Sequence, residues 1–279
     1  MEIRTLDAIA IGDSSRVSEA RRTAAKAAQR LGFSEAEAGK VAIAATEAAT
    51  NVVKHAGEGK LLVNIERDGD SAAVVLLAID NGAGISNVVE ALRDGYSTAG
   101  SPGTGLGAMQ RLATRFEMYS RPGAGTAVLA RFERPGYKIA KREPPLRVGG
   151  LFVATAGEEN CGDAIAILRQ SACTRLLVVD GLGHGLHAYE AAQAAVAAFH
   201  ANPGGTLEDV LTAMHMACRP TRGAVAALAE IDPGASRVRY AGAGNISAAI
   251  VGLERDYNLV SHNGTLGHEL RKVQEFSYP

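Results

Sequence analysis

A basic segment with two adjacent prolines interrupts the chain near its middle. Residues 138–147 read KIAKREPPLR, and Pro144-Pro145 disfavours the interior of both helices and strands. Because 279 residues are enough for two compact domains, we expect a linker at 138–147 that separates a domain at 1–137 from a domain at 148–279. Helical and strand patterns occur in both parts, so each is predicted to be α+β.

The N-terminal part alternates between helical and strand patterns. Ser34, followed three residues later by Glu37, matches a capping box at the start of a long helix that Gly57 ends. A polar turn at 67–70 separates two β-rich segments and predicts a hairpin. The expected order is helix 14–30, helix 36–55, strands 60–66 and 72–80, a helix from about 106 to 116, and two strands around 123–125.

The C-terminal part has a similar mixture of patterns. Two alanine-rich segments have the length and composition of helices, and an Asp-Pro-Gly turn at 232–234 lies between two strand-like segments. The expected order is strands 151–156 and 175–180, helices 184–200 and 206–218, and strands 224–231, 237–241 and 246–253.

Bulk composition excludes several classes of protein. Hydrophobic residues make up 47% and charged residues 21% of the chain, as in a globular protein with a filled core. Lys plus Arg (29) nearly balances Asp plus Glu (30), so no long-range field favours nucleic acid or an anionic membrane. Short apolar runs and an N-terminus without a signal-peptide pattern predict a cytoplasmic protein. The three cysteines lie far apart and are expected to be reduced thiols.

Polar residues suited to a binding site occur at two places in the N-terminal part. Glu47 and Asn51 are four residues apart on an expected helix, so their side chains share one face, although a solvated stripe gives the same pattern. Asp80 ends an apolar strand just before two glycines that allow a sharp bend. Residues 100–107 read GSPGTGLG and lead into a helix whose backbone N–H groups can cradle phosphates, although a flexible connection is also glycine-rich.

The order of these motifs resembles that of the GHKL ATPase superfamily. The resemblance implies a Bergerat-type α/β sandwich, a histidine-kinase-like domain that binds ATP with Mg²⁺. The segments that match the N motif, the two glycine motifs and the threonine motif are, in order, Glu47 with Asn51, Asp80-x-Gly82-x-Gly84, Gly103-x-Gly105-x-Gly107 and Gly125-Thr126.

The same resemblance implies roles for the matched residues. Asn51 would hold the Mg²⁺ that bridges the phosphates, Asp80 would bind the adenine amino group, and Thr126 would support the adenine end. Glu47 would be the base that takes the proton of the acceptor hydroxyl. The other positions that would contact the cofactor are Gly82, Gly84, Gly103, Thr104, Gly105, Leu106 and Gly107.

The branch of the superfamily follows from what surrounds these motifs. His55 is the first histidine of the chain, which argues against a phosphoacceptor histidine ahead of the domain. The compact size and the DGYST sequence at 94–98 are similar to the anti-sigma serine kinases, in particular the switch kinases. This branch implies phosphorylation of a serine in an anti-sigma-antagonist (STAS) partner. The alternatives are a non-catalytic, nucleotide-dependent switch that holds a sigma-factor regulator, and an ATP-driven clamp of the repair type.

Acidic residues of the C-terminal part lie near strand ends. Asp163 follows Cys161-Gly162, and Asp180 begins the sequence DGLGHG. Carboxylates from separate strands can share divalent metals, although Asp163 can equally cap a turn and Asp180 can simply end a strand.

The DGLGHG sequence, with TRGA at 221–224 and GAGN at 242–245, resembles the SpoIIE-like branch of the PPM metal-dependent serine/threonine phosphatases. By this resemblance Asp163, Asp180 and the Gly181 carbonyl would bind two Mn²⁺ or Mg²⁺ ions in a β-sandwich with flanking helices, and His184 is expected to start a helix. Family members continue after a Tyr-Pro strand into strands that carry further ligands. We therefore expect a partial PPM-type sandwich without its C-terminal strands, and weak metal binding.

Overall fold

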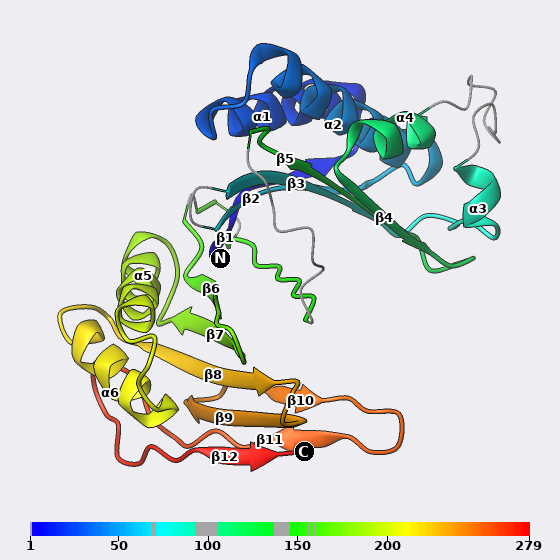
Figure 1. Cartoon of the computed structure of the whole chain (residues 1–279). Helices are drawn as coiled ribbons and strands as arrows, with labels where there is room; N and C mark the ends of the chain where they lie inside the picture. The colour runs from blue at the N-terminus through cyan, green and yellow to red at the C-terminus, as the bar shows by residue number, and fades with distance from the viewer. Residues whose placement is uncertain (1, 69–70, 93–104, 137–145, 156, 159) are drawn as a thin grey trace. The chain divides into compact units, whose positions relative to one another are not determined.

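The computed structural model describes residues 2–68, 71–92, 105–136, 146–155, 157–158 and 160–279 (Figure 1). Contacts divide the chain into two compact units, Arg4–Lys141 and Arg142–Pro279, with the first three residues assigned to the second. Each unit is α+β. The linker predicted at 138–147 lies outside the described residues except for Leu146 and Arg147.

The N-terminal unit is a five-stranded sheet with helices on one face (Figure 1). The strand order is β1-β2-β3-β5-β4, and β2, β3, β5 and β4 pair antiparallel. The elements are β1 (Glu2–Ile11), α1 (Ser14–Arg30), α2 (Glu35–His55), β2 (Gly59–Asp68), β3 (Ser71–Asp80), α3 (Val88–Ala91), α4 (Gly105–Leu112), β4 (Arg115–Ser120) and β5 (Thr126–Glu133).

Local interactions explain where the two long helices begin and end. The Asp13 side chain accepts hydrogen bonds from the backbone N–H groups of Ser15 and Arg16, which caps α1. The predicted capping box is confirmed, because Ser34 and Glu37 each accept from the other's backbone N–H. Gly57 follows α2 with a φ of 79°, a conformation that a glycine adopts without strain.

Alanines allow α1 and α2 to pack closely on each other and on the sheet. Their inward faces are almost entirely alanine, and the sheet contributes the larger aliphatic side chains. Fully buried examples are Ala20, Ala24, Ala45 and Ala49 from the helices and Val63 and Leu76 from the strands. Because of this packing, the end of the sheet that carries Asp80 lies against the second half of α2.

One strand of this unit was missed, and one helix prediction was wrong. β1 was not predicted, and the helix expected from about 106 to 116 ends at Leu112. After Leu112 the chain turns onto the sheet, because the Thr114 N–H donates to the Arg131 carbonyl at 2.8 Å. Phe116 therefore reaches the core from β4 rather than from a helix.

The C-terminal unit has a five-stranded antiparallel sheet of order β12-β9-β8-β7-β6, with α5 and α6 packed on one face, and a separate β10-β11 pair. Figure 1 shows both helices beside this sheet. The elements are β6 (Asp163–Arg169), β7 (Thr174–Gly181), α5 (Leu186–Ala201), α6 (Leu207–Cys218), β8 (Ala224–Asp232), β9 (Arg237–Ala243), β10 (Ala248–Ile250), β11 (Tyr257–Leu259) and β12 (Phe276–Tyr278).

Two strand predictions for this unit differ from the structure, and two strands were missed. Residues 151–155 form no strand. Phe152 is buried against Ile167, whereas Leu151 and Val153 on either side are exposed. The alternation of exposed and buried side chains therefore comes from the packing of one residue, Phe152, and not from a strand. Strands β6 and β11 were not predicted. The strand expected at 246–253 is only the three-residue β10.

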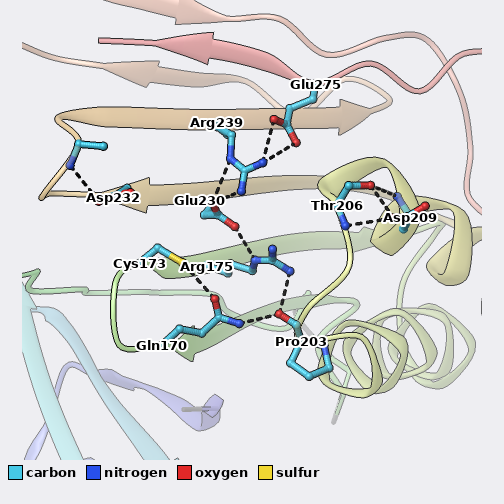
Figure 2. Close-up of polar contacts among 11 residues, drawn as sticks. Gln170, Cys173, Arg175, Pro203, Thr206, Asp209, Glu230, Asp232, Arg239 and Glu275 are labelled. Atoms are coloured by element: carbon cyan, nitrogen blue, oxygen red, sulfur yellow. Dashed lines mark hydrogen bonds and ion pairs between the residues drawn. The ribbon is translucent and has the colours of Figure 1, made fainter.

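A buried ionic network crosses the helix-facing side of this sheet (Figure 2). Arg175 on β7 donates to Glu230 on β8 at 2.7 Å, and Arg239 on β9 donates to the other Glu230 oxygen. The Arg175 and Glu230 side chains are only 6% exposed. Arg175 also donates to the Pro203 carbonyl at 3.0 Å, which ties the α5–α6 connection to the strands. Burial alone would raise the pKa of Glu230, but the hydrogen bonds from Arg239 and Arg175 outweigh it and lower that pKa.

Candidate functional site

Three polar residues form a row across the end of the N-terminal sheet. Asp80 on β3 is directly opposite Thr126 on β5, and Thr126 is directly opposite Ser120 on β4. Directly opposed residues share a sheet face, and along β3 and β5 this face also carries the buried side chains Ala78 and Val128. The row therefore lies on the helix-covered face, where the apolar core gives way to polar groups.

The backbone around Asp80 is tightly folded. The Gly82 N–H donates to Asp80 Oδ1 at 2.8 Å, which fixes the carboxylate at the start of the turn. A Cβ on Gly84 would lie 1.9 Å from the Arg121 carbonyl oxygen, and one on Gly125 would lie 1.9 Å from the Asp80 carbonyl oxygen. The φ value is 70° at Gly84 and 80° at Gly125. A side chain at either position is therefore excluded both by the lack of space and by the backbone conformation. A carboxylate can accept about four hydrogen bonds, so Asp80 retains capacity for a ligand.

The polar face of α2 meets the start of α4. A Cβ on Gly105 would lie 2.7 Å from Glu47 Oε2 and 3.7 Å from Asn51 Oδ1. The first residue of α4 therefore touches the two polar residues that helical spacing predicted to share a face. Leu106 packs against the core and Gly107 is buried, whereas Gly103 and Thr104 lie outside the described residues.

The C-terminal end of α2 also lies against the Asp80 turn. A Cβ on Gly82 would lie 2.8 Å from the Ala56 Cβ, and one on Gly59 would lie 2.8 Å from a methyl group of Val52. Glycines at these two positions let the helix approach the sheet end. The predicted residues Glu47, Asn51, Asp80 and Thr126 are thus drawn from one helix and two neighbouring strands that pack together.

Ser120 lies beside the predicted site residues but was not predicted from the sequence. Its hydroxyl accepts from the Ile85 N–H at 2.8 Å, donates to the Gly125 carbonyl at 2.9 Å and lies 2.9 Å from the Thr126 hydroxyl. It therefore connects the turn after Asp80 with the residue opposite Asp80. The only sequence signal is a small hydroxyl residue that closes the hairpin before Gly125-Thr126, and its meaning depends on the strand register.

In the C-terminal unit, two carboxylates face each other across neighbouring strands. Asp163 on β6 and Asp180 on β7 are directly opposed at the strand ends, and each is exposed over part of its surface. Partial burial and then the charge of Asp180 raise the pKa of Asp163. The Gly181 N–H donates to the Gly162 carbonyl at 3.0 Å, so the backbone of Gly181 lies at the same end of the β6–β7 pair as the two carboxylates. A divalent cation would relieve the repulsion between these carboxylates.

In the loop after Asp180, a histidine contacts another carboxylate. His184 Nδ1 lies 2.6 Å from Glu158 Oε1. Gly185 caps α5 with a φ of 71°, and a Cβ there would lie 2.4 Å from Glu158 Oε2. His184 thus precedes the helix by two residues rather than starting it.

The fit of these residues to a metal centre is partial. Among the described residues, no group of three or more His, Cys, Asp or Glu side chains is arranged to hold a metal ion. Asp163, Asp180 and the Gly181 carbonyl are oxygen donors of the kind that Mg²⁺ and Mn²⁺ prefer, but two carboxylates are fewer than such ions usually require.

Comparison with known families and proteins gives matches for the N-terminal unit. Residues 12–132 match the histidine kinase-like ATPase domain. The serine/threonine-protein kinase RsbT of Bacillus subtilis (strain 168) is 32% identical over 111 residues, which are 40% of this chain and 84% of RsbT.

Two solved structures are similar to parts of the chain. One is from a study of the bacterial stressosome, a modular system adapted to control secondary messenger signalling, with 31% identity, a TM-score of 0.44, and coverage of 45% of this chain and 66% of that one. The other is RsbX in complex with magnesium, with 20% identity, a TM-score of 0.43, and coverage of 45% and 64%. This chain thus spans less than two thirds of either. In the part of the chain that the structure describes, no helix has the length and apolarity needed to cross a bilayer.

Proposed function

Because the chain belongs, through residues 12–132, to the histidine kinase-like ATPase family that includes the kinase RsbT, we propose that it is a bacterial signalling regulator that controls serine phosphorylation. Its N-terminal unit binds ATP with Mg²⁺ and transfers the γ-phosphoryl group to a serine of an anti-sigma-antagonist (STAS) partner. Its C-terminal unit is a phosphoserine phosphatase-like domain.

One observation supports the kinase proposal above others. The α2 residues Glu47 and Asn51 meet the start of α4, and the same helix packs by its C-terminal end on the turn after Asp80. For a nucleotide bound in this region, Asp80 on the sheet side would offer a polar group to the adenine. Glu47 and Asn51 on the helix side would offer polar groups to the phosphates and the metal.

Each residue has a role that its chemistry allows. The Asn51 carboxamide oxygen is a hard donor suited to Mg²⁺, and the metal would supply charge neutralisation for the phosphates. The Asp80 carboxylate accepts from the exocyclic amino group of adenine. The Glu47 carboxylate accepts the proton of the attacking serine hydroxyl while that oxygen bonds to the γ-phosphorus and the bond to the ADP oxygen breaks.

In the C-terminal unit, Asp163, Asp180 and the Gly181 carbonyl would hold Mn²⁺ or Mg²⁺, which activates water in such sites. Their donor set is incomplete, so metal binding is expected to be weak. A kinase and a phosphatase that acted on the same serine would only consume ATP. The two units therefore differ in substrate, or one of them is catalytically idle.

The kinase proposal is tested by incubating the chain with γ-labelled ATP, Mg²⁺ and purified STAS domains, and following label transfer to serine. Transfer should be lost in Glu47→Gln, which should still bind ATP, and ATP binding should be lost in Asp80→Asn. If the wild-type chain transfers no label but holds a partner in a nucleotide-dependent way, the non-catalytic switch for a sigma-factor regulator replaces the kinase.

The phosphatase proposal has a separate test. Phosphate release from a phosphoserine STAS domain is measured with added Mn²⁺ for the wild type and for Asp180→Asn. Release that requires Mn²⁺ and falls in the variant supports the metal mechanism. An equal rate in the two proteins would discard it.

A further inference from the structure

Ser120 connects three separate segments at the end of the N-terminal sheet that carries Asp80. Its partners are the Ile85 N–H, the Gly125 carbonyl and the Thr126 hydroxyl, at 2.8, 2.9 and 2.9 Å. Ile85 belongs to the turn that follows Asp80, and Thr126 is the residue directly opposite Asp80. No role for this hydroxyl follows from the motifs on either side of it.

The hydrogens of these hydroxyls can be assigned by counting donors. A serine hydroxyl has one proton to donate and two lone pairs that accept. The Ser120 proton goes to the Gly125 carbonyl, and one lone pair accepts from the Ile85 N–H. The 2.9 Å contact with Thr126 must then be a hydrogen bond that Thr126 donates. Thr126 has no other hydroxyl proton, so it presents only acceptor lone pairs to a ligand.

We propose that Ser120 is a positioning residue that makes Thr126 an acceptor and thereby makes the nucleotide site select a purine with a 6-amino group. Asp80 beside it is a carboxylate and also only accepts. Two acceptors side by side favour the amino group of adenine, which donates two hydrogen bonds. A 6-oxo purine places an acceptor oxygen in the same position and is repelled. The inference rests on the proposed ATP site and names how that site discriminates between bases.

The test uses a pair of nucleotides that differ at the purine 6-position. Kd is measured for ATP and inosine triphosphate, each with Mg²⁺, for the wild-type chain and for Ser120→Ala. The wild type should prefer ATP. In Ser120→Ala the Thr126 hydroxyl is free to donate, so the preference should fall about two- to tenfold, the range of one neutral hydrogen bond. Ser120→Thr retains a hydroxyl at a strand position and should restore the preference.

Two further variants separate this role from a loss of structure. Thr114 also accepts a backbone N–H with its hydroxyl, from Glu133 at 3.1 Å, at the other end of the β4–β5 pair. Thr114→Ala should leave the ATP preference unchanged. In a Thr126→Val background, Ser120→Ala should have no further effect on the preference, because the hydroxyl through which it acts is gone.

The outcomes distinguish this inference from the proposed function. If the wild type binds neither nucleotide, both are overturned. If it binds ATP and inosine triphosphate equally, or if Ser120→Ala weakens both by the same factor, only the role of Ser120 is overturned. A loss of preference in Ser120→Ala that persists unchanged in the Thr126→Val background would also overturn it.

Discussion

The proximity of Glu47, and not an unusual backbone conformation, explains the glycine at position 105. It lies at the start of α4 without a left-handed φ, yet a Cβ there would lie 2.7 Å from Glu47 Oε2, closer than van der Waals contact allows. Gly105→Ala must therefore displace the Glu47 carboxylate. Since about 1 Å of misplacement can cost on the order of a hundredfold in rate, we expect serine phosphorylation to fall ten- to a hundredfold (~1.4–2.7 kcal/mol), measured as initial rates at saturating ATP.

Two matched variants control this prediction. Gly39 is also a helical glycine, but its Cβ position is in open space, so Gly39→Ala should keep the rate and stabilise the protein by about 0.5–1 kcal/mol. In a Glu47→Asp background the acid is one methylene shorter, so Gly105→Ala should cost much less. An equal loss in both backgrounds would show that Gly105 does not act through Glu47.

Helical periodicity predicted correctly which polar residues share one face of a single element. Glu47 and Asn51 were placed on one face by helical periodicity alone, and the contact of both with Gly105 agrees with that spacing. Ser120 could not be found in this way, because its partner Ile85 lies 35 positions away and the contact depends on how β3, β5 and β4 are aligned. The roles of these residues in binding and transfer stay predictions.

The ionic network of the C-terminal sheet predicts how much Glu230 contributes to the stability of the fold. Glu230 is buried between Arg175 and Arg239, so Glu230→Gln leaves the buried Arg175 guanidinium without its anion and leaves Arg239 paired with Glu275 alone. Removing one partner of a buried pair costs about 3–5 kcal/mol. We expect a loss of this size in the unfolding free energy from urea titration. Glu117→Gln, in an ion pair with side chains 45% and 49% exposed, should change it by less than about 1 kcal/mol.

The same network predicts how stability depends on pH. The folded-state pKa of Glu230 is lowered below its ordinary value of 4.5. Such a group stabilises the fold fully above its unfolded-state pKa, and this contribution is lost as the pH falls through the folded-state pKa. The difference in unfolding free energy between wild type and Glu230→Gln should therefore be constant near neutral pH and shrink below about pH 4.5. A difference that stays the same at acidic pH would show that the loss is not ionic.

Helices were predicted more accurately than strands for a physical reason. The bounds of α1 are those expected from sequence, and α2 begins within one residue of its predicted start, because caps and periodicity are local. β1 and β6 were missed and the described residues 151–155 were wrongly assigned to a strand, because a strand is stabilised by partners elsewhere in the chain. The alternation at 151–153 comes from Phe152 packing on Ile167 outside any ladder.

Among the described residues, each unit has a large buried core of its own. One is formed by α1, α2 and α4 with strands of the N-terminal sheet, and the other by α5 and α6 with β6–β9. Each core has its own buried side chains, so each unit can respond to its own ligand. This arrangement would allow the kinase and phosphatase activities proposed above to be regulated by different signals.

The separate cores predict that ATP protects only part of the molecule. A ligand at a hundredfold excess over its Kd stabilises the state that binds it by about 2.7 kcal/mol, and slowly exchanging amides that open by global unfolding of that unit should exchange on the order of a hundredfold more slowly. With ATP and Mg²⁺, hydrogen–deuterium exchange should slow in α2 and β3 and stay unchanged in α5 and β8. Asp80→Asn should remove the slowing. Equal slowing in both units would show that nucleotide binding is coupled to the C-terminal unit, and slowing in neither would contradict the nucleotide site.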